Sequence, residues 1–400
     1  MEPSLTWLDL TARDRDKMRR VIDLFSEQGT VDEMGLGTIR DTLSDTLFPG
    51  TSVIQTRLRY FLFIPWLYQR LEHKRTAVSD IAKIIRNAEL DLVGALLNSE
   101  DTDGIIGSQA RNTLTRLPSE IYWAGLVRWG IFLHPQSRGW YHAHFDTLTR
   151  GQDHINPSDD PGVVWTRQPA WHPRMPAPPE GFPWEASLAL TADESEFLRG
   201  RIEERCSDSL LAWLAREGSS YLAESFWDDP VALQASNNLG TAIELTRRFS
   251  LHVEGLPLFY NLLLAERRHA DQGTDADLIE KYRTALHEWA DRESAERPFD
   301  TAMLWRFLVE NGGRMIEPQR RFVETWTKLA TEAGAASLID SMPVRHLVEQ
   351  RELQLKGKRA RLSNKERLID WTGDVGTGRM NFRWPRVRQL LIDLHQGLEA

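Results

Sequence analysis

Residues 35–68 read GLGTIRDTLSDTLFPGTSVIQTRLRYFLFIPWLY and hold the longest continuous apolar run of the chain, Tyr60–Tyr68. The run is far shorter than the ~20 apolar residues that a membrane span needs. A helix that is apolar on every side is normally buried in the middle of a domain. The stretch therefore predicts a central helix from Ser52 to about Glu72, capped by Thr51 or Ser52. Pro65 is expected to kink or interrupt this helix.

Charged residues are dense around this helix. An unpaired buried charge costs roughly 3–5 kcal/mol, so these groups are expected to pair. We interpret them as a structural ion-pair cluster that stabilises the central helix, and a functional polar site is the alternative interpretation. The cluster consists of Arg40, Asp41, Asp45, Arg57 and Arg59.

Composition limits the class of protein. A length of 400 residues is typical of two or three domains, and 41% apolar residues can form a large core. The net charge of −9 argues against a surface coated with nucleic acid, although a local basic patch is compatible with it. Cys206 is the single cysteine, which excludes internal disulfides. The N-terminal sequence has no secretory signal, so we expect a soluble, cytoplasmic protein without a membrane segment.

The periodicity of apolar residues predicts a mainly α, multi-domain helical protein. The predicted helices include one that Pro118 opens and those at 14–28, 38–47, 241–249, 257–269 and 301–310. Proline-rich and tryptophan-rich sequence between the helical parts indicates a long connector, which Trp165, Trp171 and Trp184 are expected to fix by packing. Thr191–Glu194 forms a capping box that begins a helix. The basic C-terminal region leaves room for a short β-hairpin. We predict an N-terminal helical domain at 1–150, a connector at 151–186, a second helical domain at 187–335 and a basic region at 336–400.

The strongest functional signal is basic. From Arg345 to Arg388 there are twelve Lys or Arg and five Asp or Glu residues. Arginines interleaved with aromatic residues are suited to phosphate contacts and base stacking. The alternative is a tail that pairs with acidic surface of this protein or of a partner. The candidate nucleic-acid-binding residues are Lys356, Lys358, Arg359, Arg361, Arg379, Arg383, Trp384, Arg386 and Arg388.

Several motifs resemble one bacterial family. They are Thr6–Asp9, the block Gly35–Ser52, Gln55–Tyr60, Tyr122–Ile131 and Phe382–Pro385. Together they are similar to domain-of-unknown-function family 6361. Its members tend to be encoded in phage-defence islands beside a helicase and a phospholipase-D-like nuclease. The resemblance implies a setting, an antiphage assembly with those proteins as partners, and no mechanism. Combined with the basic segment, it leads to the hypothesis of a non-catalytic adaptor or nucleic-acid-sensing subunit, with DNA as a further candidate partner.

Enzyme motifs are weak. His142 and His144, together with Asp146, share one face if the segment is extended, which leaves a metal-dependent nuclease or hydrolase as the alternative function. The glycine spacing of 373–379 is that of a phosphate-binding loop, but Arg379 stands where that motif needs Lys. A glycine turn between short strands is the preferred interpretation of this loop. The sequence assigns no catalytic residue, no metal and no cofactor.

Overall fold

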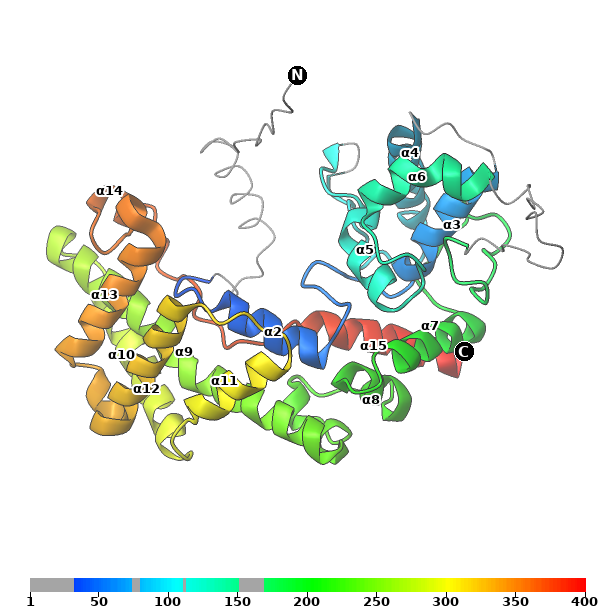
Figure 1. Ribbon diagram of the computed structural model, residues 1–400. Helices are drawn as coiled ribbons and strands as arrows, with labels where there is room; N and C mark the ends of the chain where they lie inside the picture. The colour runs from blue at the N-terminus through cyan, green and yellow to red at the C-terminus, as the bar shows by residue number, and fades with distance from the viewer. Residues whose placement is uncertain (1–31, 74–79, 111–112, 151–168) are drawn as a thin grey trace, which may run out of the picture. The chain divides into compact units, whose positions relative to one another are not determined.

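A computed structural model describes residues 32–73, 80–110, 113–150 and 169–400. The expected helix at 14–28 lies outside these ranges. Helices and loops make up the described residues, which confirms the mainly α prediction (Figure 1). An isolated bridge between Phe132 and Trp171 is the only β pairing in the described ranges. The hairpin allowed for 336–400 is therefore absent, and so are the short strands expected around 373–379.

The central helix is α3 (Tyr60–His73), and its apolar run is buried as predicted. Pro65 lies inside the helix rather than ending it. The predicted start at Ser52 was wrong. Backbone N–H groups before α3 bond to distant side chains instead of a helical ladder: Leu58 donates to Asp393, and Arg57 donates to Tyr122. These tertiary contacts keep residues 51–59 out of the helix.

The described chain clusters into two compact units. Unit 1 comprises residues 32–42 and 245–381, and unit 2 comprises residues 43–244 and 382–400. The divisions fall within α2 (Gly37–Leu47) and within α9 (Asn237–Gln272). Each unit thus joins two distant stretches of sequence, whereas the four predicted domains follow the chain in order. Independent folding of those predicted domains stays a prediction.

Unit 2 contains two groups of helices. In the first, α3 packs against α4 (Ile81–Leu96) and α5 (Pro118–Arg128), and α5 contacts α6 (Arg138–Arg150). In the second, α7 (Ala192–Arg205), α8 (Leu210–Glu217) and α15 (Trp384–Glu399) pack together, and the short turns η3 (Phe226–Asp228) and η4 (Ala232–Gln234) lie beyond α8.

The capping box predicted at the start of α7 is confirmed. The Thr191 hydroxyl accepts a hydrogen bond from the Glu194 N–H at 3.3 Å, and the Glu194 carboxylate accepts one from the Thr191 N–H at 3.2 Å. Two donors at the helix N-terminus that have no intrahelical acceptor are satisfied in this way.

Unit 1 contains the C-terminal part of α9 together with five further α-helices and two short 3-10 turns. These are α10 (Ala276–Ser294), α11 (Thr301–Glu310), α12 (Glu317–Ala333), η5 (Ala335–Leu338), α13 (Met342–Lys356), η6 (Gly357–Arg359) and α14 (Lys365–Ile369). Its core includes Trp289 and Trp326, whose indole N–H groups donate to carbonyls of α9.

Two helices predicted at 241–249 and 257–269 form one helix, α9. Pro257 removes only one backbone donor, and its neighbours Leu256 and Phe259 are fully buried. Tertiary packing therefore maintains the helix through the proline. No helix in the described ranges is long and apolar enough to cross a membrane.

Candidate nucleic-acid interface

The structure divides the nine candidate nucleic-acid-binding residues between the two units. Lys356, Lys358, Arg359, Arg361 and Arg379 belong to unit 1. Arg383, Trp384, Arg386 and Arg388 belong to unit 2.

The three candidate arginines of unit 2 donate hydrogen bonds to backbone carbonyls of nearby loops. Arg383 precedes α15, donates to the Thr51 carbonyl at 3.0 Å and forms an ion pair with Asp45. Arg386 donates to the Val53 carbonyl, and Arg388 to the Leu222 carbonyl. These contacts hold the start of α15 against loops of its own unit. Self-pairing of this kind is the alternative raised for the basic tail.

Trp384 lies in the core of unit 2. Its side chain is 1% exposed, its indole N–H donates to the Ala223 carbonyl, and its ring lies 5.8 Å from that of Phe48. The ring therefore packs against another side chain of the protein, and its N–H already has a hydrogen-bond acceptor. Its position is that of a core residue, and stacking on a base would require it to leave that core.

Arg379 ends the glycine-rich loop of unit 1. It donates to the Ser250 hydroxyl at 3.2 Å and to the Arg247 carbonyl at 3.3 Å. Gly373 and Gly376 have positive φ angles of 99° and 69°, as turns require. Residues 336–400 are all described by the structure. Within them, no strand precedes this loop and no helix begins directly after it. Its local structure is thus unlike that of a phosphate-binding loop.

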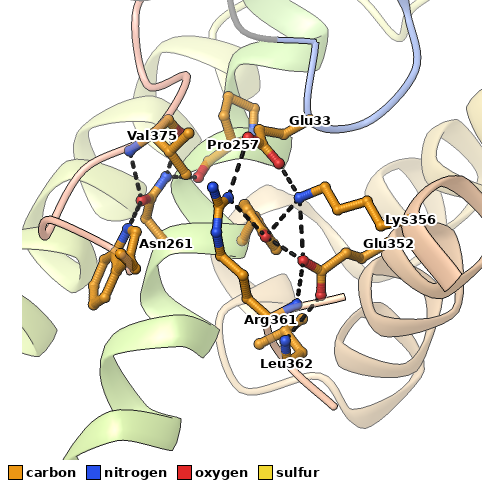
Figure 2. A network of polar contacts seen from close by, with 10 residues as sticks. Glu33, Pro257, Asn261, Glu352, Lys356, Arg361, Leu362 and Val375 are labelled. Atoms are coloured by element: carbon orange, nitrogen blue, oxygen red, sulfur yellow. Dashed lines mark hydrogen bonds and ion pairs between the residues drawn. The ribbon is translucent and has the colours of Figure 1, made fainter. Parts of the chain in front are cut away.

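The segment after α13 is fixed by a buried polar network (Figure 2). Glu352 is fully buried and accepts hydrogen bonds from the N–H groups of Arg361 at 2.9 Å and Leu362 at 3.0 Å. It also accepts one from the hydroxyl of Tyr260 and pairs with Lys356 at 3.1 Å. A single carboxylate therefore connects the end of α13 to the chain that follows η6.

Glu33 completes the network from the other part of unit 1. Its carboxylate pairs with Lys356 and, at 3.2 Å, with Arg361. Burial, together with the carboxylates of Glu33 and Glu352, raises the pKa of Tyr260 well above its ordinary value, so this hydroxyl stays a donor. Lys356 and Arg361 thus have structural roles on either side of η6.

Between and after these two anchored cations, the chain presents other cations to solvent. Lys358 and Arg359 lie on η6 and are exposed, and Gly357 turns the chain there with a φ of 54°. Lys365 and Arg367 are exposed on α14, which Asn364 caps through its side chain. Lys365 pairs with Asp271 at 2.7 Å, and Arg367 lies 3.6 Å from Asp370. We call Lys358, Arg359, Lys365 and Arg367 the outer cations.

The members of the predicted ion-pair cluster all have partners, and most partners come from elsewhere in the sequence. Arg57 pairs with Asp393 and Asp101. Arg59 pairs with Glu194 at 2.7 Å. Asp45 pairs with Arg383, and Arg40 with the adjacent Asp41. Arg57, Arg59 and Asp45 therefore each pair with a residue that is far away in the sequence.

The histidine interpretation depended on an extended segment, and that segment is the helix α6. Helical geometry places residues two apart on different faces, so His142 and His144 diverge. The His142 Nε2 lies 2.7 Å from the Tyr68 hydroxyl, whereas the His144 Nδ1 lies 2.8 Å from the Trp140 carbonyl. Within the described ranges no group of three or more His, Cys, Asp or Glu side chains is arranged to hold a metal ion.

The chain belongs to the family of unknown function DUF6361, whose model matches residues 3–397. Among curated proteins and among solved structures, none matches the chain significantly.

Proposed function

We propose that this member of the family is a non-catalytic, nucleic-acid-binding subunit of a prokaryotic antiphage defence assembly. The outer cations would contact phosphates. The observation that carries the proposal is the fixed geometry of their segment, in which buried Glu352 bonds to the chain on both sides of η6. A rigid turn that presents exposed Lys and Arg loses little conformational entropy when it binds.

The net charge of the chain limits how much of its surface can contact nucleic acid. With a net charge of −9, binding is expected to depend on a local patch of basic residues rather than on the whole surface. Four phosphate contacts to duplex would give a plot of log affinity against log salt with a slope of about −3.6. The helicase and nuclease partners enter the proposal because relatives of the family tend to be encoded beside such proteins.

The test measures binding of the full chain to labelled duplex DNA, single-stranded DNA and RNA across a salt series. The variant Lys358→Glu/Arg359→Glu removes two of the outer cations. Its expected effect is weaker binding and a salt slope that is smaller in magnitude by about 2.

A matched control is Arg321→Glu/Lys328→Glu. This variant makes the same charge change at exposed positions of α12 in the same unit. The control should bind nearly as the natural protein does. Absence of binding at low salt, or equal losses in both variants, would contradict the proposal and would point to an acidic protein surface as the partner of the outer cations.

A further inference from the structure

Unit 2 has a hollow of about 720 Å³ that none of the preceding interpretations uses. One wall comes from the end of α4 and the residues after it, and another from the chain that leads into α7. Its lining includes Arg59, Asn98, Ser99, Trp184, Glu185 and Ser187. All of these residues belong to one unit, so the hollow is complete within it.

An exposed tryptophan stands in this hollow. The side chain of Trp184 is 64% exposed, and no other aromatic ring in the described part of the chain contacts it. Burial at this position was expected, because the sequence suggested that tryptophans would pack the connector. Trp171 follows that expectation at 3% exposure, Trp184 departs from it, and Trp165 lies outside the described residues.

The backbone that carries Trp184 is firmly held. The neighbouring Phe182 is buried and stacks on Phe63 at 5.8 Å, and its carbonyl accepts a hydrogen bond from Arg70 at 3.0 Å. The Trp184 N–H itself donates to the Gly181 carbonyl at 2.8 Å. An indole exposed on a fixed turn offers a preformed stacking surface.

Polar groups accompany this surface. Asn98 and Glu185 are exposed side chains of the lining, and an amide and a carboxylate are the groups that recognise base edges. Arg59 is buried beside them. Its terminal nitrogens bond to Ser187 and Glu194, but its Nε–H has no partner among the described residues. Because that nitrogen is itself buried, it is not an accessible donor for a ligand, and the accessible polar groups of the lining include those of Asn98 and Glu185.

We propose that this hollow binds a nucleobase, with the ring stacked on Trp184 and its polar edge toward Asn98 and Glu185. The charges favour an uncharged ring over a phosphate, because Glu194 already pairs with Arg59 and Glu185 adds a negative charge. Two sources of the base are distinguished by experiment: a free nucleoside and a single strand. Only the second source rests on the proposed function.

The first experiment measures binding of free adenosine, cytidine, guanosine and uridine to the full chain by calorimetry, with ribose as the baseless probe. At least one nucleoside should bind where ribose does not. Trp184→Ala should weaken that binding about tenfold, as expected for loss of one stacked base, and Trp184→Phe should retain most of it. Tyr221→Ala, which truncates an aromatic residue that is 80% exposed in the same unit, should bind normally.

A second experiment separates the two sources. A short single-stranded oligonucleotide is compared with an abasic strand of equal length, using Trp184→Ala and Lys358→Glu/Arg359→Glu. Loss of affinity with the abasic strand and with Trp184→Ala supports binding of a base within a strand. Loss only with the Lys358 and Arg359 variant leaves the proposed function intact and overturns the strand source.

Nucleoside binding that depends on Trp184, without any binding of strands, would support the base site while the proposed function fails. No nucleoside binding above that of ribose, or binding that Trp184→Ala leaves unchanged, would overturn the inference.

Discussion

The Arg57 Nε–H lies 3.0 Å from each carboxylate oxygen of Asp393, although the two residues are 336 positions apart in the sequence. Both side chains are buried, and the Asp393 carboxylate also accepts a hydrogen bond from the Leu58 N–H at 2.8 Å. The contact therefore joins α15 to the segment just before α3 and fixes where α3 begins.

Arg57→Ala should destabilise the protein by roughly 3–5 kcal/mol, because it leaves the Asp393 carboxylate buried without its cation. Urea denaturation measures the free energy of unfolding. Arg320→Ala is the control, since its ion pair with Glu324 is about 40% exposed and should contribute little to stability. A difference between the two variants of less than about 1 kcal/mol would refute the structural role assigned to Arg57.

Glu89 predicts a pH dependence of stability. Its carboxylate is buried and accepts hydrogen bonds from the N–H and hydroxyl of Ser119. Burial is the largest effect and raises its pKa from 4.5 to about 7. The folded state then holds a proton that the unfolded state releases near pH 4.5. The stabilisation is complete below that pH and is lost as the pH rises to about 7.

Glu89→Gln removes this titration. Relative to the variant, the natural protein should lose about 3 kcal/mol of unfolding free energy between pH 4.5 and 7, from the size of the shift. Thermal or urea unfolding at several pH values measures the difference. Parallel pH profiles for the two proteins would show that folding does not raise the pKa of Glu89.

Asn261 holds the glycine-rich loop of unit 1 (Figure 2). Its side-chain carbonyl accepts from the Val375 N–H at 2.9 Å and from the Trp371 indole, and its amide donates to the Val375 carbonyl at 2.7 Å. Asn261→Ala should speed hydrogen exchange at the Val375 amide and cost roughly 1–3 kcal/mol. Asn311→Ala, at the exposed end of α11, should leave exchange at Val375 unchanged. An unchanged exchange rate at the Val375 amide in Asn261→Ala would show that Asn261 does not anchor the loop.

The α7 capping box gives a fourth prediction. Thr191→Ala removes the hydroxyl that accepts from the Glu194 N–H and should lower stability by about 1 kcal/mol. Thr191→Ser keeps the hydroxyl and should restore most of that loss. Chemical denaturation of both variants tests this, and an equal loss in both would assign the effect to the methyl group instead.

Helices with a strong local signal could be predicted from the sequence. Residues 38–47, the helix that Pro118 opens, and Thr301–Glu310 were expected nearly as they occur, because caps and apolar periodicity act over a few residues. The start of α3 was missed because Asp393 and Tyr122, which bond to the chain before it, lie far away in sequence. Local rules carry no information about such partners.

The sequence predicted that the candidate interface is basic. It did not predict which of its cations are structural and which are exposed to solvent. Lys356 and Arg361 could not be told from Lys358 and Arg359 without Glu33, which lies more than 320 positions earlier. One local signal was present: Glu352 and Lys356 are four residues apart on α13, a spacing that favours an ion pair. The exposure of Trp184 had no sequence signal, since burial is the usual state of tryptophan.

Arg351 donates to the Met34 carbonyl at 2.8 Å and to the Gly35 carbonyl at 3.1 Å, across 316 residues for the latter. On the ribosome, the early segment emerges long before its partner exists. At typical rates of synthesis the wait is roughly 16–60 s, far longer than helix formation needs. Met34 and Leu36, buried in the finished protein, are without these partners for that interval. A nascent chain stalled before Arg351 should therefore depend on chaperones that shield apolar segments.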